Sequence, residues 1–271
     1  MHGVARIGFA ARDSHTRLAT LYQQAPLRVL FPRPPPGEPP HAVLVTTSGG
    51  LVGGDRLEVE IETGQDARAL VTTQAAEKVY RSTGAPARVM VALRAGPGSW
   101  LEWCPQESIL FDRTRLRRHT TLRLEPESRV LAGDILVFGR RAHGERLRSG
   151  SVHDLWEVRS ADRLVWADAL RLEGDLAAQL AAPFGFAGAT AYASLIYAGA
   201  DAADRRDLLR ELVGGGDADL RAGVTCLPGL LLARWLGKDA ARLRAGFTRA
   251  WTGLRHAAAG LAAATPTTWN C

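Results

Sequence analysis

The sequence predicts a mainly β protein of the α+β class, rich in antiparallel strands, with a few helices in its C-terminal third. Seven or more segments before residue 175 show the alternation of apolar and polar residues that is typical of half-buried strands. No helical pattern of crossover length separates these segments, which favours antiparallel pairing and argues against Rossmann and TIM-barrel folds. Strong helical periodicity begins only after residue 200.

The clearest strand pattern lies at residues 56–62, RLEVEIE. Leu57, Val59 and Ile61 fall on one face, and three glutamates fall on the other, where we expect water or the arginines of a neighbouring strand. Residues 87–94 and 99–105 are expected to form a hairpin across a Gly-Pro-Gly turn at 96–98. Further strands are expected at 67–74, 119–125, 129–139, 151–160, 163–174, 189–199 and 219–229.

Two helices are predicted, at residues 201–216 and 238–263. In the second, Phe247 and Trp251 belong to an apolar stripe with helical spacing, and we interpret this stripe as core. The length favours one domain over residues 1–271, with a β-rich front at 1–175 and a mixed strand and helix region at 176–271.

The net charge of the chain is compatible with a protein partner and with a nucleic-acid partner. The formal net charge is +6, but the 34 basic residues are spread along the chain. The densest cluster, RTRLRRH at 113–119, is interpreted as a solvated strand face, with a nucleic-acid-binding β protein as the alternative function. Neither a secretory signal nor an apolar run of membrane length is present, so we expect a cytoplasmic protein without a membrane partner.

The glycine-rich segment TTSGGLVGGD at 46–55 does not have the spacing of a phosphate-binding loop. Gly54 is followed by the negative charge of Asp55 and then by a strand, whereas a phosphate loop leads into a helix. We interpret the segment as a turn that lets two strands approach closely, with Asp55 receiving backbone amides.

No catalytic residues are predicted. The three cysteines, Cys104, Cys226 and Cys271, have no C-x-x-C spacing, and the seven histidines are scattered. Glu102 and Glu107 disfavour a thiolate at Cys104, so we expect this cysteine to be buried; a hydrolase that uses it is a weaker hypothesis.

Several longer stretches resemble the urease accessory protein D family, called UreD or UreH. They extend in the family's order from about residue 26 to the C-terminus: PLRVLFP, SGGLVGGDRLEVEI, LVTTQAAEKVYRS, LEWCPQESILFD, AGDILVFGRRAHGE, AGVTCLPGLLLARWLG and, more loosely, FTRAWTGLRHAAAG. Two positions depart from the family pattern. The family usually ends in Pro-Arg-aliphatic-Trp, whereas residues 266–269 are PTTW, and Cys104 stands where an aliphatic residue is common.

The resemblance implies stacked β-sheets with helix-like winding and a non-enzymatic role in urease maturation. The implied partners are a helical accessory protein of the UreF type, a UreG-type GTPase bound through it, and the urease apoprotein. The resemblance also implies that nickel crosses the protein transiently through an internal polar passage, with no tightly bound cofactor. Scattered carboxylates and hydroxyls suit this role, because clusters of imidazole and thiolate would trap the ion.

The family motifs also supply candidate residues. Asp55, Asp134 and Glu173 are the candidates for weak contact with nickel, accompanied by the hydroxyls of Thr72 and Thr73. The candidates for fixing the fold or a partner surface are Lys78, Tyr80, Arg81, Glu107, Arg140 and Glu145.

Overall fold

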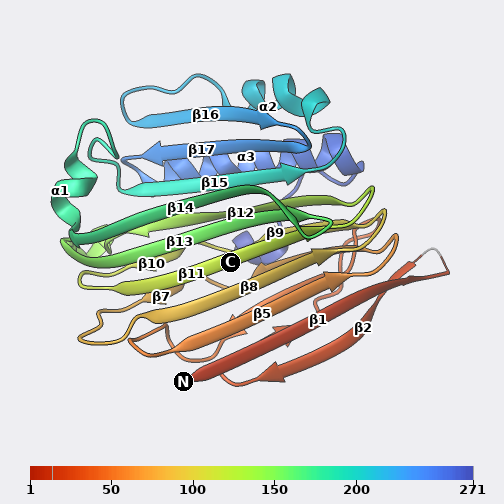
Figure 1. Ribbon diagram of the computed structural model, residues 1–271, viewed down its shortest axis with the longest axis horizontal. Coiled ribbons are helices and arrows are strands. Elements are labelled where there is room, and N and C mark those ends of the chain that lie inside the picture. Colours follow the sequence, from red (N-terminus) through yellow and green to blue (C-terminus); the bar gives the residue numbers. More distant parts are fainter. Residues whose placement is uncertain (14, 271) are drawn as a thin grey trace.

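The computed structural model describes residues 1–13 and 15–270 and has three layers (Figure 1). Sheet A contains seven strands in the order β14-β13-β11-β8-β5-β1-β2. Their bounds are β1 His2–Arg12, β2 His15–Gln24, β5 Arg56–Thr63, β8 Ala87–Ala95, β11 Arg115–Leu124, β13 Ser149–Ser160 and β14 Arg163–Asp175.

Sheet B has ten strands; in Figure 1 β12, β9, β10 and β7 lie behind sheet A, and β15, β17 and β16 extend above its edge. Its strands are β3 Leu27–Leu30, β4 His41–Thr46, β6 Arg68–Thr73, β7 Glu77–Val79, β9 Trp100–Cys104, β10 Ser108–Leu110, β12 Arg129–Phe138, β15 Ala191–Ala198, β16 Leu220–Leu227 and β17 Leu230–Gly237. The helices are α1 Leu176–Ala181, α2 Arg206–Val213 and α3 Ala240–Ala259, with short 3-10 turns η1 Arg141–His143, η2 Ala203–Arg205 and η3 Thr267–Asn270.

The winding is that of a solenoid, as the family resemblance implied. Between β4 and β13 the chain passes repeatedly from one sheet to the other, so that neighbours within a sheet belong to successive coils. Such neighbours run parallel: β1, β5, β8, β11 and β13 in sheet A, and β4, β6, β9 and β12 in sheet B. The prediction of a mainly β fold with a few C-terminal helices is therefore confirmed.

The prediction of antiparallel-rich pairing is wrong for these central coils. Parallel strands need a return path, and here the opposite sheet provides that path instead of a crossover helix. Antiparallel pairs lie on either side of these parallel coils, at β1-β2, β3-β4, β13-β14, β12-β15, β15-β17 and β16-β17.

The expected hairpin at residues 87–105 is also wrong. β8 pairs with β5 and β11 in sheet A, whereas β9 pairs with β6 and β12 in sheet B. The Gly-Pro-Gly segment at 96–98 forms the corner between the sheets. A Cβ on Gly96 would lie 2.6 Å from the carbonyl oxygen of Thr63, so the corner requires glycine at this position.

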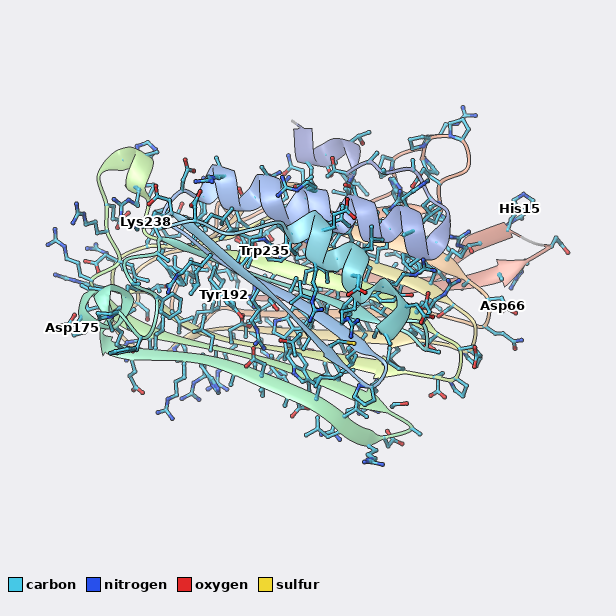
Figure 2. The ribbon with its side chains drawn as sticks, turned by 90° about the horizontal axis from the view of Figure 1, so that it is seen from above. His15, Asp66, Asp175, Tyr192, Trp235 and Lys238 are labelled. Carbon is cyan, nitrogen blue, oxygen red and sulfur yellow. The ribbon has the colours of Figure 1, made fainter. Side chains whose placement is uncertain are left out.

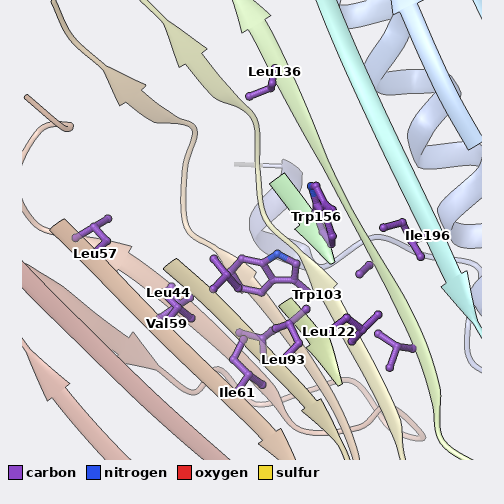
Figure 3. Packing of buried hydrophobic residues seen from close by; sticks show 14 of the residues in the cluster. Leu44, Leu57, Val59, Ile61, Leu93, Trp103, Leu122, Leu136, Trp156 and Ile196 are labelled. Atoms are coloured by element: carbon purple, nitrogen blue, oxygen red, sulfur yellow. The ribbon is translucent and has the colours of Figure 1, made fainter. Parts of the chain in front are cut away.

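The inner core fills the space between the sheets, as Figure 3 shows for residues from both of them. Leu57, Val59 and Ile61 are 4%, 5% and 1% exposed, which confirms the face predicted from period two. On the outer face, Glu60 accepts a hydrogen bond from Arg6 at 3.1 Å across the β1-β5 pair. This contact confirms the expectation of arginines on a neighbouring strand.

The outer core lies between sheet B and the helices. Figure 2 shows the long helix α3 along the face of the sheet that includes Trp235. Phe247 and Trp251, both fully buried, pack in this layer as predicted. Because sheet B is covered on both faces, β12 and β15 are almost continuously buried and do not alternate.

β1 and β2 have no counterpart among the predicted strands. They form an antiparallel hairpin at the edge of sheet A, and its tip projects at the end marked by His15 in Figure 2. β2 is exposed along almost its whole length, so its sequence lacks the alternation that marks a half-buried strand. None of the helices in the described part of the chain is long and apolar enough to cross a membrane.

Candidate functional site: a polar cavity between the sheets

A small cavity of about 80 Å³ lies between the two sheets, and we call it the inner cavity. Apolar residues of the inner core form most of its wall. Its polar lining comes from several strands and the loops after them: Thr46, Thr73, Glu77, Gln106, Ser108, Arg118, Thr120 and Asp134. Two of the residues predicted for a passage, Asp134 and Thr73, therefore line one space.

Asp134 is held at the middle of sheet B and points inward. It lies on β12, which pairs with β15 in register Asp134 to Ser194, and it is 2% exposed. The preceding Gly133 faces the helices, where a Cβ would lie 2.9 Å from the Phe247 ring. The alternation of the strand then directs the Asp134 carboxylate toward sheet A.

The Asp134 carboxylate is only partly neutralised. Its Oδ2 forms an ion pair with Arg118, while Oδ1 accepts no hydrogen bond from any described residue. Arg118 is shared, because its Nε and Nη2 donate to the two carboxylate oxygens of Asp154 at 2.8 and 2.5 Å. The three side chains together thus carry one negative charge more than positive charge when both carboxylates are ionised.

This arrangement changes the protonation of Asp134. Burial raises its pKa from the ordinary 3.8 to about 7, an effect that the charge of Arg118 opposes and that of Asp154 reinforces. Near pH 7 the protonated and ionised forms of Asp134 are therefore both populated. A divalent cation that reached the cavity would compete with that proton for the same oxygen atoms.

Glu77 supplies a second carboxylate to the inner cavity. Burial raises its pKa, against the opposing hydrogen bond that Thr46 donates at 2.7 Å. Glu77 was not among the predicted site residues, although it lies inside the family-like stretch TTQAAEKVYRS. The sequence offered no signal to separate it from the other charged residues there.

The prediction of a solvated strand face at 113–119 is wrong for Arg118. Arg115 and Arg117 are exposed, as expected for a solvated strand face, but Arg118 lies on the inner face of β11 with a side chain only 9% exposed. The alternation along the strand places Arg118 on the same face as Leu116 and Thr120, which are both buried. The sequence pattern therefore does indicate a buried position for Arg118. Arg118 is therefore not part of any exposed basic surface.

Asp55 lies in the glycine turn and not in the wall of the inner cavity. It accepts a hydrogen bond from the Val52 amide at 2.8 Å and one from the N-terminal amine of Met1 at 2.7 Å. Close approach of the turn is confirmed, because a Cβ on Gly50 would lie 2.6 Å from the Lys78 carbonyl oxygen. The predicted amide contact of Asp55 is confirmed as well.

Glu173 is also apart from the inner cavity. Its side chain is 66% exposed and pairs with Arg171 at 3.0 Å. It borders a surface hollow of about 840 Å³ together with Arg113, Arg115 and Arg148. The structure thus does not bring the three predicted carboxylates, Asp55, Asp134 and Glu173, into one site.

Thr72 points to the helical side of sheet B, away from Thr73. Its hydroxyl donates to the Cys104 carbonyl oxygen at 2.6 Å and accepts from the Trp269 indole at 3.0 Å. Cys104 is buried, as expected, and burial together with Glu102 raises the pKa of its thiol. Cys271 lies outside the described residues.

The candidates at 78–81 lie beside the glycine turn. Tyr80 donates its hydroxyl to the Gly49 carbonyl oxygen at 3.0 Å and packs edge-on against Phe111 at 4.8 Å. Lys78 and Arg81 are exposed. Tyr80 therefore contacts the turn, whereas the two cations lie at the surface.

The other three candidates make charge contacts. Glu107 forms an ion pair with Arg244 of α3. Arg140 lies over the Phe111 ring at 4.8 Å and pairs with Glu145 at 3.5 Å. Across the residues that the structure describes, no three His, Cys, Asp or Glu side chains lie close enough together to hold a metal ion.

Comparison with known proteins gives consistent matches over the chain. A family model described as UreD urease accessory protein matches residues 1–270. A protein named urease accessory protein UreD from Magnetococcus marinus is 49% identical over 260 residues, covering 94% of this chain and 89% of that protein. Proteins of the same name from Methylobacterium sp. and Rhodopseudomonas palustris are 42% and 41% identical over 243 residues, covering 89% and 90% of this chain and 86% of each relative.

Proposed function

The chain belongs to the family of UreD urease accessory proteins, and from this premise we propose that it is a non-enzymatic scaffold in urease maturation. In this proposal it binds a helical UreF-type protein and, through that protein, a UreG-type GTPase. The resulting complex docks on the urease apoprotein in the cytoplasm, without a nucleic-acid partner. GTP hydrolysis belongs to the GTPase, since this sequence has no phosphate-binding loop.

We further propose that the inner cavity is part of the route by which nickel reaches urease. One observation carries this proposal: Asp134, a buried carboxylate with an unpartnered oxygen and a pKa near neutrality, faces a cavity that Glu77 and Thr73 also line. Oxygen ligands hold late first-row metal ions more weakly than imidazole or thiolate ligands do. An ion in such a site can leave again, and nickel is therefore cargo and not a resident cofactor.

The test is an activation assay with isosteric variants. Urease apoprotein is incubated with the accessory proteins, GTP and nickel, and Asp134→Asn and Glu77→Gln are compared with the wild-type chain. We expect each variant to lower the activation rate, because an amide does not supply the negative charge that attracts the ion. Asp204→Asn, at an exposed position, is the matched control and should activate normally.

A pull-down of each variant with the UreF-type partner separates the two parts of the proposal. Reduced activation with normal complex formation supports the nickel route. Normal activation by the Asp134→Asn, Glu77→Gln double variant would exclude the inner cavity from that route. Failure of the wild-type chain to capture the partner would contradict the scaffold role itself.

A further inference from the structure

A second cavity, of about 480 Å³, lies at the end of the molecule that carries α1, and we call it the α1 cavity. In Figure 1 this end is marked by the projecting helix α1, and in Figure 2 by the label of Asp175, the residue that caps α1. The cavity lies between the segment 138–148, which includes η1, and residues 177–190 after β14. It is separate from the inner cavity, with which it shares no residue.

The charge of the α1 cavity is entirely positive. Arg141, Arg146 and Arg148 line it, and no Asp or Glu does. All three arginines are exposed, and none forms an ion pair or a side-chain hydrogen bond within the described part of the chain. Neighbouring Arg140, by contrast, is paired with Glu145. Three guanidinium groups without partners attract anions, because their bidentate geometry matches carboxylates.

The surface hollow next to the α1 cavity has a different charge pattern. The hollow on the other side of Arg148 is lined by Glu173 and Asp175 as well as by arginines, so its charges are mixed. An anionic ligand is thus favoured in the α1 cavity and not along the whole end of the molecule.

The floor of the α1 cavity is apolar. Phe138, Leu147, Leu180 and Ala189 are buried side chains that form its inner wall. A ligand that fits this cavity therefore needs an aliphatic or aromatic side chain in addition to negative charge.

The loop after α1 adds an exposed aromatic residue beside the cavity. Phe184 is fully exposed, with a relative exposure of 106%. The loop is nevertheless anchored, since the Gly188 amide donates to the Leu180 carbonyl oxygen at 2.7 Å and Arg221 donates to the Phe186 carbonyl oxygen at 2.9 Å. Aromatic residues, including phenylalanine, and arginines are enriched in protein interfaces relative to the rest of the surface.

We propose that the α1 cavity is a docking site for an acidic segment of a partner protein, with an apolar side chain inserted between carboxylates that pair with Arg141, Arg146 and Arg148. The proposal rests on the scaffold role only in that the segment belongs to a protein of the maturation assembly. It concerns the binding of an acidic protein segment at the α1 cavity, which the proposed nickel route does not involve.

Binding is measured by fluorescence anisotropy with the full chain and one defined probe. The probe is a fluorescein-labelled peptide in which a Leu-Phe pair is flanked on each side by two glutamates. We expect saturable binding that weakens as salt is raised from about 0.05 M to about 0.5 M, because salt screens charges at a surface. The same peptide with glutamine in place of glutamate should bind at least roughly tenfold more weakly.

Three variants test the site itself. The double variant Arg141→Glu, Arg146→Glu reverses two exposed charges, and Ala181→Trp fills the cavity without changing its charge; each should weaken binding by roughly tenfold or more. Arg163→Glu, exposed at the opposite end of β14, reverses one charge away from the cavity, as each of the two cavity substitutions does at its own position, and should leave binding unchanged.

Two results would overturn the proposal. One is equal loss of binding in Arg163→Glu and in the cavity variants, which would show only attraction to net positive charge. The other is tighter binding of a single-stranded oligonucleotide than of the peptide at the same cavity, which would assign the surface to nucleic acid. Either result leaves the urease activation assay unaffected, so failure here is distinguishable from failure of the proposed function.

Discussion

At the scale of single residues, Asp134 makes the stability of the protein depend on pH. Its pKa is about 7 in the folded chain, raised by burial from 3.8. Between about pH 4 and pH 7 the unfolded chain has released this proton, whereas the folded chain still holds it. The contribution of Asp134 to the free energy of unfolding is therefore greatest at low pH and is lost as the pH rises through this window.

We predict that the Asp134→Asn variant does not show this fall in the free energy of unfolding as the pH rises. The free energy of unfolding of the variant, relative to wild type, should increase between about pH 4 and about pH 8 by as much as about 4 kcal/mol. Arg118 keeps its paired contact with Asp154, so the substitution leaves that cation partnered. Urea unfolding at several pH values measures the difference. A difference that stays constant over the range would show that Asp134 titrates normally.

The inner cavity could be predicted from the sequence only in part. Asp134 and Thr73 were found through family-like motifs, and no periodicity or spacing argument identified them. Arg118 was missed because the density of charge at 113–119 was given more weight than the alternation that places it on the buried face. Glu77 was missed because only the tertiary structure brings its strand β7 to the wall of the cavity.

The buried ion pair between Arg255 and Glu102 could not be predicted from the sequence at all. Arg255 is 1% exposed, and its Nε donates to Glu102 at 3.0 and 2.8 Å, while Glu102 also accepts a hydrogen bond from the Trp100 indole at 2.9 Å. From the sequence, Glu102 was considered only as a neighbour of Cys104. The two partners are 153 positions apart, so no local pattern joins them.

At the scale of elements, the chain end is packed against α3. Trp269, in η3, is 7% exposed and stacks with Phe247 at 6.1 Å. Arg244 lies over the Trp269 ring at 4.5 Å and donates to its carbonyl oxygen at 3.0 Å. Although residues 267 and 268 depart from the family's usual ending, the tryptophan is held by aromatic, cation–π and hydrogen-bond contacts.

We predict that Trp269→Ala lowers the free energy of unfolding by roughly 3–5 kcal/mol, because it removes a buried aromatic side chain and leaves a cavity beside Phe247. Urea denaturation monitored by circular dichroism measures this loss. Trp166→Ala, on the partly exposed β14, is the matched control and should cost about 1 kcal/mol. Equal losses in the two variants would contradict the anchoring role of Trp269.

Strand positions were more predictable than strand partners. The period-two pattern identified β5 and its buried face because that pattern depends only on neighbouring residues. Pairing depends on where each turn directs the chain, and the corner at Gly96 looks like a hairpin turn in the sequence. The crowding of that glycine against Thr63 becomes visible only when both sheets are in place.

At the scale of the whole molecule, sheet B joins the two cores. One face of this sheet contributes Leu136 and Ile196 to the inner core, and the other contributes Trp235 to the outer core. β12 lies in the middle, between β9 and β15, and is buried on both faces. β2, in contrast, pairs along one edge only and is exposed along almost its whole length.

We therefore predict a gradient of hydrogen exchange from the centre of the molecule to its edge. Amides of β12 should exchange only when the whole chain unfolds, whereas those of β2 should exchange at least about a hundredfold faster, because opening one edge strand breaks few buried contacts. Exchange followed by mass spectrometry on peptides covering 15–24 and 129–138 makes this comparison in one sample.

Adding the UreF-type partner supplies an independent observation, since a partner bound along β2 would slow exchange there and leave β12 unchanged. Equal protection of the two strands in the isolated chain would mean that the edge hairpin unfolds only together with the core, and the gradient would then be wrong.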